Sequence, residues 1–415
     1  MDQVVIFEDS SYRNLLPLVY WRACCELRCG YTSLLDKQQR TWPKASVRLS
    51  VRPEIADVVA ERLALPVNQA PGGAAVFVNG RLLKGLSPEQ IKPGTYGVSN
   101  GEVVYISADA ATAARLTPDV LLNVEKLTAS LAALKQVECE LPKRGLMRYP
   151  WDLVHANEDE LVEDWKRSGG AAIEGRLCDG AYVLNESAVY VGKGSVIKPC
   201  SVLDAEDGPI YIDDDVTISP NVTVQGPCYI GRKCLIQPTA MIREGTSLGE
   251  VCKVGGEVEC SIVHGYSNKQ HTGFLGHAYV CEWINLGAGC TNSDLKNTYG
   301  SVRVPLNGQK EIDSGETFVG MMVGDHSKTG INTAFATGSV LGTCCNVFVS
   351  SHPGKFTPSF SWHTDKGLTE YDAKRGLEVA RKVMGRRKKD VTPALEKLFL
   401  SLPQIARKHE APAQS

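Results

Sequence analysis

The sequence predicts three successive parts: an α/β domain over residues 1–150, a parallel β-helix over residues 181–352 and a helical extension over residues 353–415. An apolar period of six residues predicts the β-helix, and strands alternating with helices predict the α/β domain. Residues 151–180, which are polar, acidic and helical in pattern, form the expected linker. A chain of 415 residues has room for about two to three such units.

The six-residue period is clearest from Ile212 to Val258, where it never slips. It places an apolar residue at Ile212, Ile218, Val224, Ile230, Ile236, Ile242, Leu248 and Val254. A small or β-branched residue follows each of these by four places. Neither an α-helix nor an alternating strand has this period, so it describes a repeat of one short strand and a corner. Three repeats would close a triangular coil, with the apolar residues stacked inside from coil to coil.

The repeat begins at Val191 and ends near Val347, and it lapses at residues 260–272 and 291–317. We interpret both lapses as loops that leave the wall of the solenoid, which is often where repeat proteins bind their ligands. The lapses are therefore the first places to search for function.

The N-terminal part has a different pattern. Val4–Phe7 and Ala75–Val78 are apolar enough for buried strands, whereas Pro53–Leu65 and Pro118–Val137 have helical spacing. This alternation predicts an α/β domain with a mainly parallel sheet.

Beyond the repeat, Lys355–Trp362 is extended and aromatic in character, and helical patterns follow at Glu370–Lys389 and Thr392–Lys408. We expect these helices to cover the open end of the solenoid, whose strand edges would otherwise stay unpaired. The basic run Arg386–Lys389 is typical of a solvated helix end.

The composition is that of an ordinary globular protein, with 43% hydrophobic and 22% charged residues. A net charge of −2 gives no reason to expect nucleic acid or an anionic membrane as a partner. The N-terminus lacks the pattern of a secretory signal, and no apolar run approaches the roughly 18 residues of a membrane span. The 14 cysteines include no CxxC pair, so we expect a reduced, cytoplasmic protein.

Two linked motifs carry the chemistry. His271–Gly276 reads HTGFLG and Asn285–Gly289 reads NLGAG, with the histidine and the asparagine fourteen residues apart. They resemble the acyltransferase half of the bifunctional N-acetylglucosamine-1-phosphate uridyltransferase/glucosamine-1-phosphate acetyltransferase family, which carries H-x-x-[YF]-L-G and N-[IL]-G-A-G at that spacing. The resemblance implies a nucleotidyltransferase-like first domain, a left-handed β-helix and a homotrimer whose neighbouring helices form the cleft.

The resemblance also implies roles. His271 would be the general base that takes a proton from an acceptor amine, a role that a neutral imidazole suits. Asn285 would position the acceptor, and the backbone of Gly287, Ala288 and Gly289 would bind acetyl-CoA or another acyl-CoA. Lys269 and Lys296 would hold a phosphate on the acceptor. The structural alternative is a histidine that only caps a turn.

The sequence departs from the family pattern at three places. Lys269 lies two residues before His271, where the family has its lysine three before. Phe274 replaces a tyrosine, and Asn292 lies two residues before the place where the family has an asparagine. Phe274 and Asn292 therefore remain candidate substrate contacts.

A second cluster, Gly324–Thr333, reads GDHSKTGINT. It resembles proteins catalogued as sugar nucleotidyltransferases with a C-terminal left-handed β-helix, a likeness that runs from Leu16 to Trp362. His326 and Lys328 are candidates for an anion site, and ordering of the corner is the alternative. No metal site is expected, because histidines about six residues apart lie on different faces of a triangular coil.

The first domain resembles sugar-phosphate nucleotidyltransferases at Leu16–Leu18 and Arg22, but with a cysteine at the place of the family's lysine and no glycine in the preceding loop. Arg13, Arg22 and Arg28 are the candidate phosphate contacts. Because a loop without glycine brings few backbone N–H groups close to a phosphate, we expect a degenerate domain, with Mg²⁺ required only if it is active.

The sequence thus favours acyl-CoA-dependent acyl transfer to an amino-sugar phosphate or nucleotide-sugar. The first alternative is Mg²⁺-dependent transfer of a nucleotidyl group to a sugar 1-phosphate. The second is a regulatory or scaffold protein without catalysis.

Overall fold

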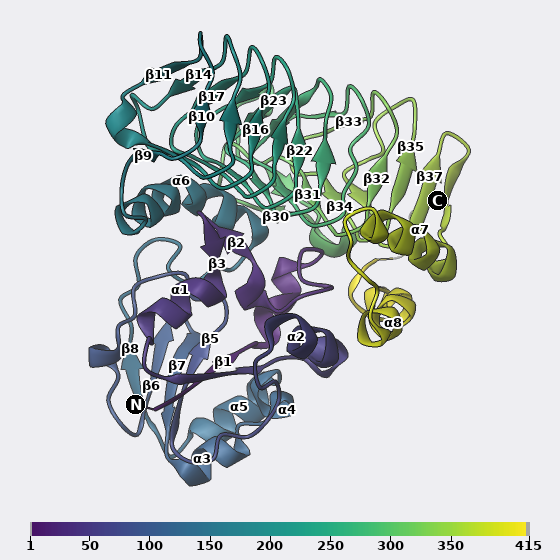
Figure 1. Ribbon diagram of the computed structural model, residues 1–415. Coiled ribbons are helices and arrows are strands. Elements are labelled where there is room, and N and C mark those ends of the chain that lie inside the picture. Colours follow the sequence, from purple (N-terminus) through teal and green to yellow (C-terminus); the bar gives the residue numbers. More distant parts are fainter. Residues whose placement is uncertain (1, 412–415) are drawn as a thin grey trace.

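The computed structural model describes residues 2–411. An α/β domain, a long β-solenoid and two C-terminal helices follow one another along the chain, and the two helices return to lie beside the first domain (Figure 1).

The N-terminal domain contains one six-stranded sheet in the order β4-β1-β5-β7-β6-β8. Its strands are β1 (Gln3–Phe7), β4 (Ser46–Ser50), β5 (Ala75–Asn79), β6 (Thr95–Ser99), β7 (Glu102–Ala108) and β8 (Lys135–Glu138). The pairs β1–β4, β1–β5 and β6–β8 are parallel, whereas β5–β7 and β6–β7 are antiparallel. The sheet is therefore mixed, and the expectation of a mainly parallel sheet is only partly met. The antiparallel part arises because Asn100 and Gly101, both at positive φ, form a two-residue hairpin turn.

The helices of this domain are short. They are α1 (Leu34–Thr41), α2 (Ala56–Leu63), α3 (Ala110–Arg115), α4 (Pro118–Leu121) and α5 (Val124–Leu131), with 3-10 turns at Ser10–Leu15, Cys24–Glu26, Pro53–Ile55 and Pro88–Gln90. The prediction of one helix over Pro118–Val137 is wrong. Asn123 interrupts it as the N-cap of α5, accepting a hydrogen bond from the Lys126 amide at 3.0 Å, and the chain then enters β8.

The predicted linker is the longest helix, α6 (Pro150–Arg167), which leads into the solenoid. The solenoid is a left-handed parallel β-helix with three walls, as the period and the resemblance predicted. The first wall holds β10 (Arg176–Leu177), β13 (Val196–Ile197), β16 (Thr217–Ile218), β19 (Leu235–Ile236), β22 (Lys253–Val254), β25 (Asn268–Lys269), β32 (Lys328–Thr329), β35 (Asn346–Phe348), β37 (Ser361–Thr364) and β38 (Gly367–Glu370).

The other two walls are built in the same way. The second holds β11 (Tyr182–Leu184), β14 (Val202–Asp204), β17 (Thr223–Gln225), β20 (Met241–Ile242), β23 (Glu257–Glu259), β26 (Phe274–Gly276), β28 (Thr291–Asn292) and β33 (Ala334–Phe335). The third holds β9 (Ala172–Ile173), β12 (Val189–Val191), β15 (Ile210–Ile212), β18 (Cys228–Ile230), β21 (Thr246–Leu248), β24 (Ile262–Val263), β27 (Tyr279–Val280), β31 (Met322–Val323), β34 (Val340–Leu341) and β36 (Phe356–Thr357).

The apolar positions predicted from the period form the inner stack. Ile212 pairs in register with Ile230, and Ile230 with Leu248, and all three side chains are fully buried. The second lapse of the repeat leaves the wall as a loop that contains the small hairpin β29 (Arg303–Val304) and β30 (Ile312–Asp313).

The C-terminal helices are α7 (Ala373–Gly385) and α8 (Pro393–His409). The first begins three residues later than predicted, because residues 367–370 form β38, which pairs antiparallel with β37 at the edge of the first wall. The helices pack on the solenoid near Cys344, and α8 also packs against α2. The chain therefore folds back on its own N-terminal domain.

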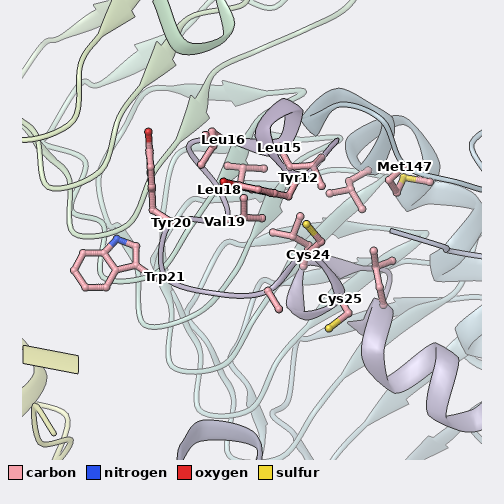
Figure 2. Close-up of a cluster of buried hydrophobic side chains, with 14 of the residues drawn as sticks. Tyr12, Leu15, Leu16, Leu18, Val19, Tyr20, Trp21, Cys24, Cys25 and Met147 are labelled. Carbon is pink, nitrogen blue, oxygen red and sulfur yellow. The ribbon is translucent and has the colours of Figure 1, made fainter. Parts of the chain in front are cut away.

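The segment between β1 and α1 joins all three parts. Tyr12, Leu15, Leu18 and Cys24 lie in a cluster of buried side chains that also includes Trp21 (Figure 2). The Trp21 indole N–H donates to Oγ1 of Thr343 in the solenoid at 2.6 Å. One hydrophobic core thus continues from the first domain into the wall of the solenoid and the C-terminal helices.

Candidate functional site

His271 lies on an exposed corner directly after β25. In the described part of the chain, its imidazole has no hydrogen-bond partner, so it does not cap a turn. The corner itself is fixed from inside by Lys269, whose side chain points into the solenoid at the level of Val254 in the coil before. A solvent-facing imidazole therefore stands on a rigid backbone.

Lys269 is the internal support of this corner. Its ammonium donates to the carbonyl oxygens of Gly255 at 2.8 Å, His271 at 3.1 Å and Gly273 at 2.6 Å. Burial lowers its pKa to about 8. All three donor positions of the ammonium are used inside the coil, so the prediction that Lys269 holds the phosphate of a substrate is wrong.

Asn285 lies on the next coil of the same wall. Its backbone pairs with Asn268 on one side and with Lys328 on the other, and its side chain is exposed. The fourteen-residue spacing therefore places His271 and Asn285 on adjacent coils of one wall, as the motif implied.

The glycines of the NLGAG motif have a structural reason of their own. A Cβ on Gly287 would overlap the carbonyl oxygen of Gly330, and one on Gly289, at φ +71°, would overlap Oδ1 of Asn332. The amide of Gly287 donates to Oγ1 of Thr329 at 3.0 Å. Close stacking of the coils therefore requires these glycines, whether or not an acyl-CoA approaches the Gly287–Ala288–Gly289 backbone.

The remaining candidates of this region differ in their availability. Phe274 is half-buried in β26. Asn292 is buried, accepts from the Gly276 amide at 3.1 Å and donates to the Gly276 carbonyl at 2.9 Å. The ammonium of Lys296 donates to the carbonyl of Ser301 at 3.0 Å. The amide of Asn292 is thus used between two coils, and its prediction as a substrate contact is wrong.

His326 and Lys328 do not form the predicted anion site. The His326 ring is buried against Trp21, with ring centroids 5.1 Å apart, and burial lowers its pKa to about 3. A neutral imidazole cannot neutralise an anion. Lys328 lies on the first wall next to Asn285, and its ammonium donates to the backbone carbonyl of His326 at 2.8 Å.

Two of the three predicted phosphate contacts are also unavailable. Arg22 is fully buried and donates to both oxygens of Asp325, at 3.1 and 2.5 Å. Burial opposes the charge of Arg22, but the Asp325 carboxylate raises its pKa well above the usual range. Arg28 donates to the carbonyl of Tyr31, and only Arg13 is exposed. The loop that would bind a triphosphate is therefore docked against the solenoid.

The carboxylates after β1 do not fit Mg²⁺ either. Glu8 pairs with Arg52 at 2.6 Å, and Asp9 pairs with Arg81 at 2.6 Å. An arginine already neutralises each carboxylate that a metal ion would need. No group of three or more His, Cys, Asp or Glu residues suited to a metal ion occurs within residues 2–411.

Sequence reasoning missed a charged cluster between the domains. Glu282 lies 3.2 Å from Nδ1 of His264 and 3.4 Å from the Arg22 guanidinium. Burial would raise the pKa of Glu282, but Arg22 and His264 hold it well below its usual range. His264 lies one coil before Glu282, a spacing that the repeat could have shown. Arg22 belongs to the first domain, so no local spacing could have identified its place in the cluster.

The fold thus joins an α/β domain to a parallel β-helix. Residues 4–169 match the family model described as Sugar nucleotidyl transferase. The chain is 32% identical over 143 residues to the bifunctional sugar-1-phosphate nucleotidylyltransferase/acetyltransferase of Sulfurisphaera tokodaii, covering 34% of this chain and 35% of that protein. It is 30% identical over 146 residues to the bifunctional protein GlmU of Heliobacterium modesticaldum, covering 32% of this chain and 31% of that protein.

The chain thus spans about a third of the length of these two curated relatives. A crystal structure of UDP-N-acetylglucosamine acyltransferase aligns with 57% of this chain and 91% of its own, at 13% identity and a TM-score of 0.30. The family model and the curated relatives confirm the predicted relationship to sugar nucleotidyltransferases and to bifunctional nucleotidyltransferase/acetyltransferase enzymes. In the part of the chain that the structure describes, no helix is both long and apolar enough to cross a membrane.

Proposed function

We propose that this chain is an acyltransferase that moves an acyl group from acyl-CoA to the amine of an amino-sugar phosphate or nucleotide-sugar, with His271 as the general base. The observation that carries the proposal is the exposed His271 imidazole on a corner fixed from inside by the three hydrogen bonds of Lys269. A base on a rigid element keeps its geometry toward a reacting amine.

The chemistry follows from these groups. The acceptor amine attacks the thioester carbonyl, forming the C–N bond while His271 takes the amine proton. The tetrahedral intermediate then collapses, the C–S bond breaks, and the imidazolium returns the proton to the thiolate of CoA. Asn285, exposed on the next coil, positions the acceptor. The N–H groups of Gly287 and Gly289 already donate to Thr329 Oγ1 and to the Thr272 carbonyl. Of this corner, the Ala288 N–H is therefore the candidate to stabilise the oxyanion.

A homotrimer belongs to this proposal. His271 and Asn285 stand on the outer surface of the wall, and five surface cavities of about 290–800 Å³ are all lined by other residues. A ligand of this size needs a concave site that buries most of its surface. A neighbouring copy of the chain would supply the second side of the cleft.

The alternative is nucleotidyl transfer in the first domain, which the match of residues 4–169 to the Sugar nucleotidyl transferase family favours. The buried pairs of Arg22 with Asp325 and of Asp9 with Arg81 weigh against it. Of the three predicted phosphate contacts they leave Arg13 as the exposed cation, and they neutralise the Asp9 carboxylate that would hold a metal ion.

The test is release of free CoA thiol from acetyl-CoA with a panel of amino-sugar phosphates and nucleotide-sugars. We expect His271→Ala to lower turnover about 10²- to 10⁴-fold, the usual contribution of a general base. The control is His352→Ala, which removes another exposed histidine of the solenoid. Equal rates for His271→Ala and the natural chain would disprove the role of the base. Pyrophosphate release from a nucleoside triphosphate, Mg²⁺ and a sugar 1-phosphate would establish the alternative instead.

A further inference from the structure

A cavity of about 430 Å³ opens where the three parts of the chain meet. The loop after β1 contributes Trp21, the solenoid contributes Trp283 and His326, and the C-terminal turn between α7 and α8 contributes Lys389. Its volume lies in the range of small-molecule sites. The cavity does not include His271, and its chemistry is independent of the proposed acyl transfer.

An aromatic column forms one side of this cavity. Tyr266, Trp283 and His326 occupy equivalent left-handed corners of three successive coils, with φ of 52°, 62° and 62°. The Tyr266 and Trp283 rings stack 4.5 Å apart at 17°, and Trp283 and His326 are nearly parallel at 6.3 Å. The electron-rich faces of such rings attract cations. Positive φ is the ordinary geometry of this corner, since Lys233 and Val251 in the two preceding coils have φ of 58° and 61°. The feature that distinguishes these three coils is the stacking of the rings.

The charges around the column are mainly negative. Five carboxylates line the cavity against three cations: Glu61, Glu250, Glu282, Asp325 and Asp390 against Arg22, Arg62 and Lys389. Arg22 pairs with Asp325 and lies 3.4 Å from Glu282, and Arg62 pairs with Glu26. Among the described residues, this leaves Glu61, Glu250 and Asp390 without an ion pair against Lys389. The excess of carboxylates disfavours phosphates and nucleotides and favours a positively charged ligand.

His326 is the second sign of a ligand. The His326 side chain is only 4% exposed, it lines the cavity, and neither ring nitrogen has a hydrogen-bond partner within residues 2–411. Neither nitrogen is fully buried, so the ring reaches the cavity that it lines. A neutral imidazole has one nitrogen that accepts a hydrogen bond, and an ammonium group is a donor that complements it.

The side chain of Lys389 occupies the position that we expect for the ammonium group of a ligand. The Lys389 ammonium lies 5.7 Å from the centre of the Tyr266 ring, at the edge of the cavity. Lys389 is exposed and belongs to the turn that follows α7. An alkylammonium group of the chain itself therefore already lies over a ring of the aromatic column.

We propose that this junction cavity binds a small organic amine in its ammonium form, with the carbon skeleton on Trp283 and Tyr266 and the ammonium directed to Glu282 and the free nitrogen of His326. The ligand competes with Lys389 for the aromatic column. Because each of the three parts of the chain contributes residues to the lining, the bound amine contacts all three.

Calorimetric titration of the full chain with 1,6-diaminohexane tests the proposal, with 1,6-hexanediol as the uncharged match and inorganic phosphate as the anionic probe. We expect saturable binding of one diamine per chain, and no binding of the diol or of phosphate. Binding of the diol as tightly as the diamine, or binding of phosphate alone, would overturn the proposal.

Two exposed variants move the affinity in opposite directions, which misfolding cannot imitate. Lys389→Gln removes the competing ammonium and should tighten diamine binding about two- to fivefold, the usual size of an exposed cation–π contact. Glu250→Gln removes a lining carboxylate and should weaken it by a similar factor. The matched controls are Lys193→Gln and Glu186→Gln, exposed residues of the solenoid outside the cavity. If the two control variants changed the affinity as much as the cavity variants, the diamine would be binding to the general surface and the proposal would fail.

Discussion

Replacing Lys269 by methionine gives the sharpest test of the inner support of the His271 corner. Burial lowers the pKa of Lys269 to about 8, whereas an unfolded lysine titrates near 10.4. Between these values the unfolded chain holds a proton that the folded chain has released, so stability rises with pH. The slope is about 1.4 kcal/mol per pH unit, and the full gain is about 3 kcal/mol between pH 8 and 10.4.

The assay is urea unfolding of the natural chain and of Lys269→Met at intervals from pH 7 to pH 10, in matched buffers with reductant. All other titrating groups are common to both proteins, so the difference in unfolding free energy isolates Lys269. Above pH 8, we expect the free energy of unfolding of the natural chain to increase relative to that of the variant. Below pH 8, the difference between the two should stay constant. A difference that stays constant from pH 7 to pH 10 would show that the Lys269 ammonium is not buried inside the coil, and it would refute the prediction.

Three further predictions concern the packing of the chain. Burial lowers the pKa of His326 to about 3, so the free energy of unfolding should fall by about 1.4 kcal/mol per pH unit below about pH 6.5. The melting temperature of His326→Phe should therefore depend less on pH in acid than that of the natural chain, and an equal dependence would contradict this. Arg22→Met should lower the free energy of unfolding by about 3–5 kcal/mol by stranding Asp325, and adding Asp325→Leu should recover most of it; a double variant no more stable than Arg22→Met would contradict this. Gly289→Ala should lower the melting temperature more than Gly180→Ala, whose Cβ meets nothing within 4 Å; equal losses would exclude a steric cause.

The solenoid could be predicted because its information is local. Each coil repeats the same apolar spacing, and Ile212, Ile230 and Leu248 stack where the period places them. The neighbouring positions of His271 and Asn285 follow from the same rule, since fourteen residues is close to one turn of a triangular coil. The sequence did not predict that Lys269 points inward, because the coil from Val254 to Lys269 is three residues shorter than three repeats of six.

Features that depend on distant partners could not be predicted. Nothing in the sequence around Arg22 indicates that it pairs with Asp325, which lies 303 residues further along the chain. Nor does the sequence of the loop after β1 show that it packs against a solenoid wall rather than facing a nucleotide. Two smaller errors had a visible signal: the Asn100–Gly101 hairpin turn and the Asn123 cap are both ordinary local patterns.

The docking of the loop after β1 has a consequence for how the protein forms during synthesis. Tyr20 donates to Glu410 at 2.7 Å, and Trp21 packs on Phe399 with ring centroids 4.9 Å apart. Domains generally fold as they leave the ribosome, N-terminal part first. Here the first domain leaves the ribosome with an apolar surface that the solenoid covers in part and that α8 completes, 390 residues later. A chain that ends before α8 would keep part of this surface exposed to water, where it favours aggregation.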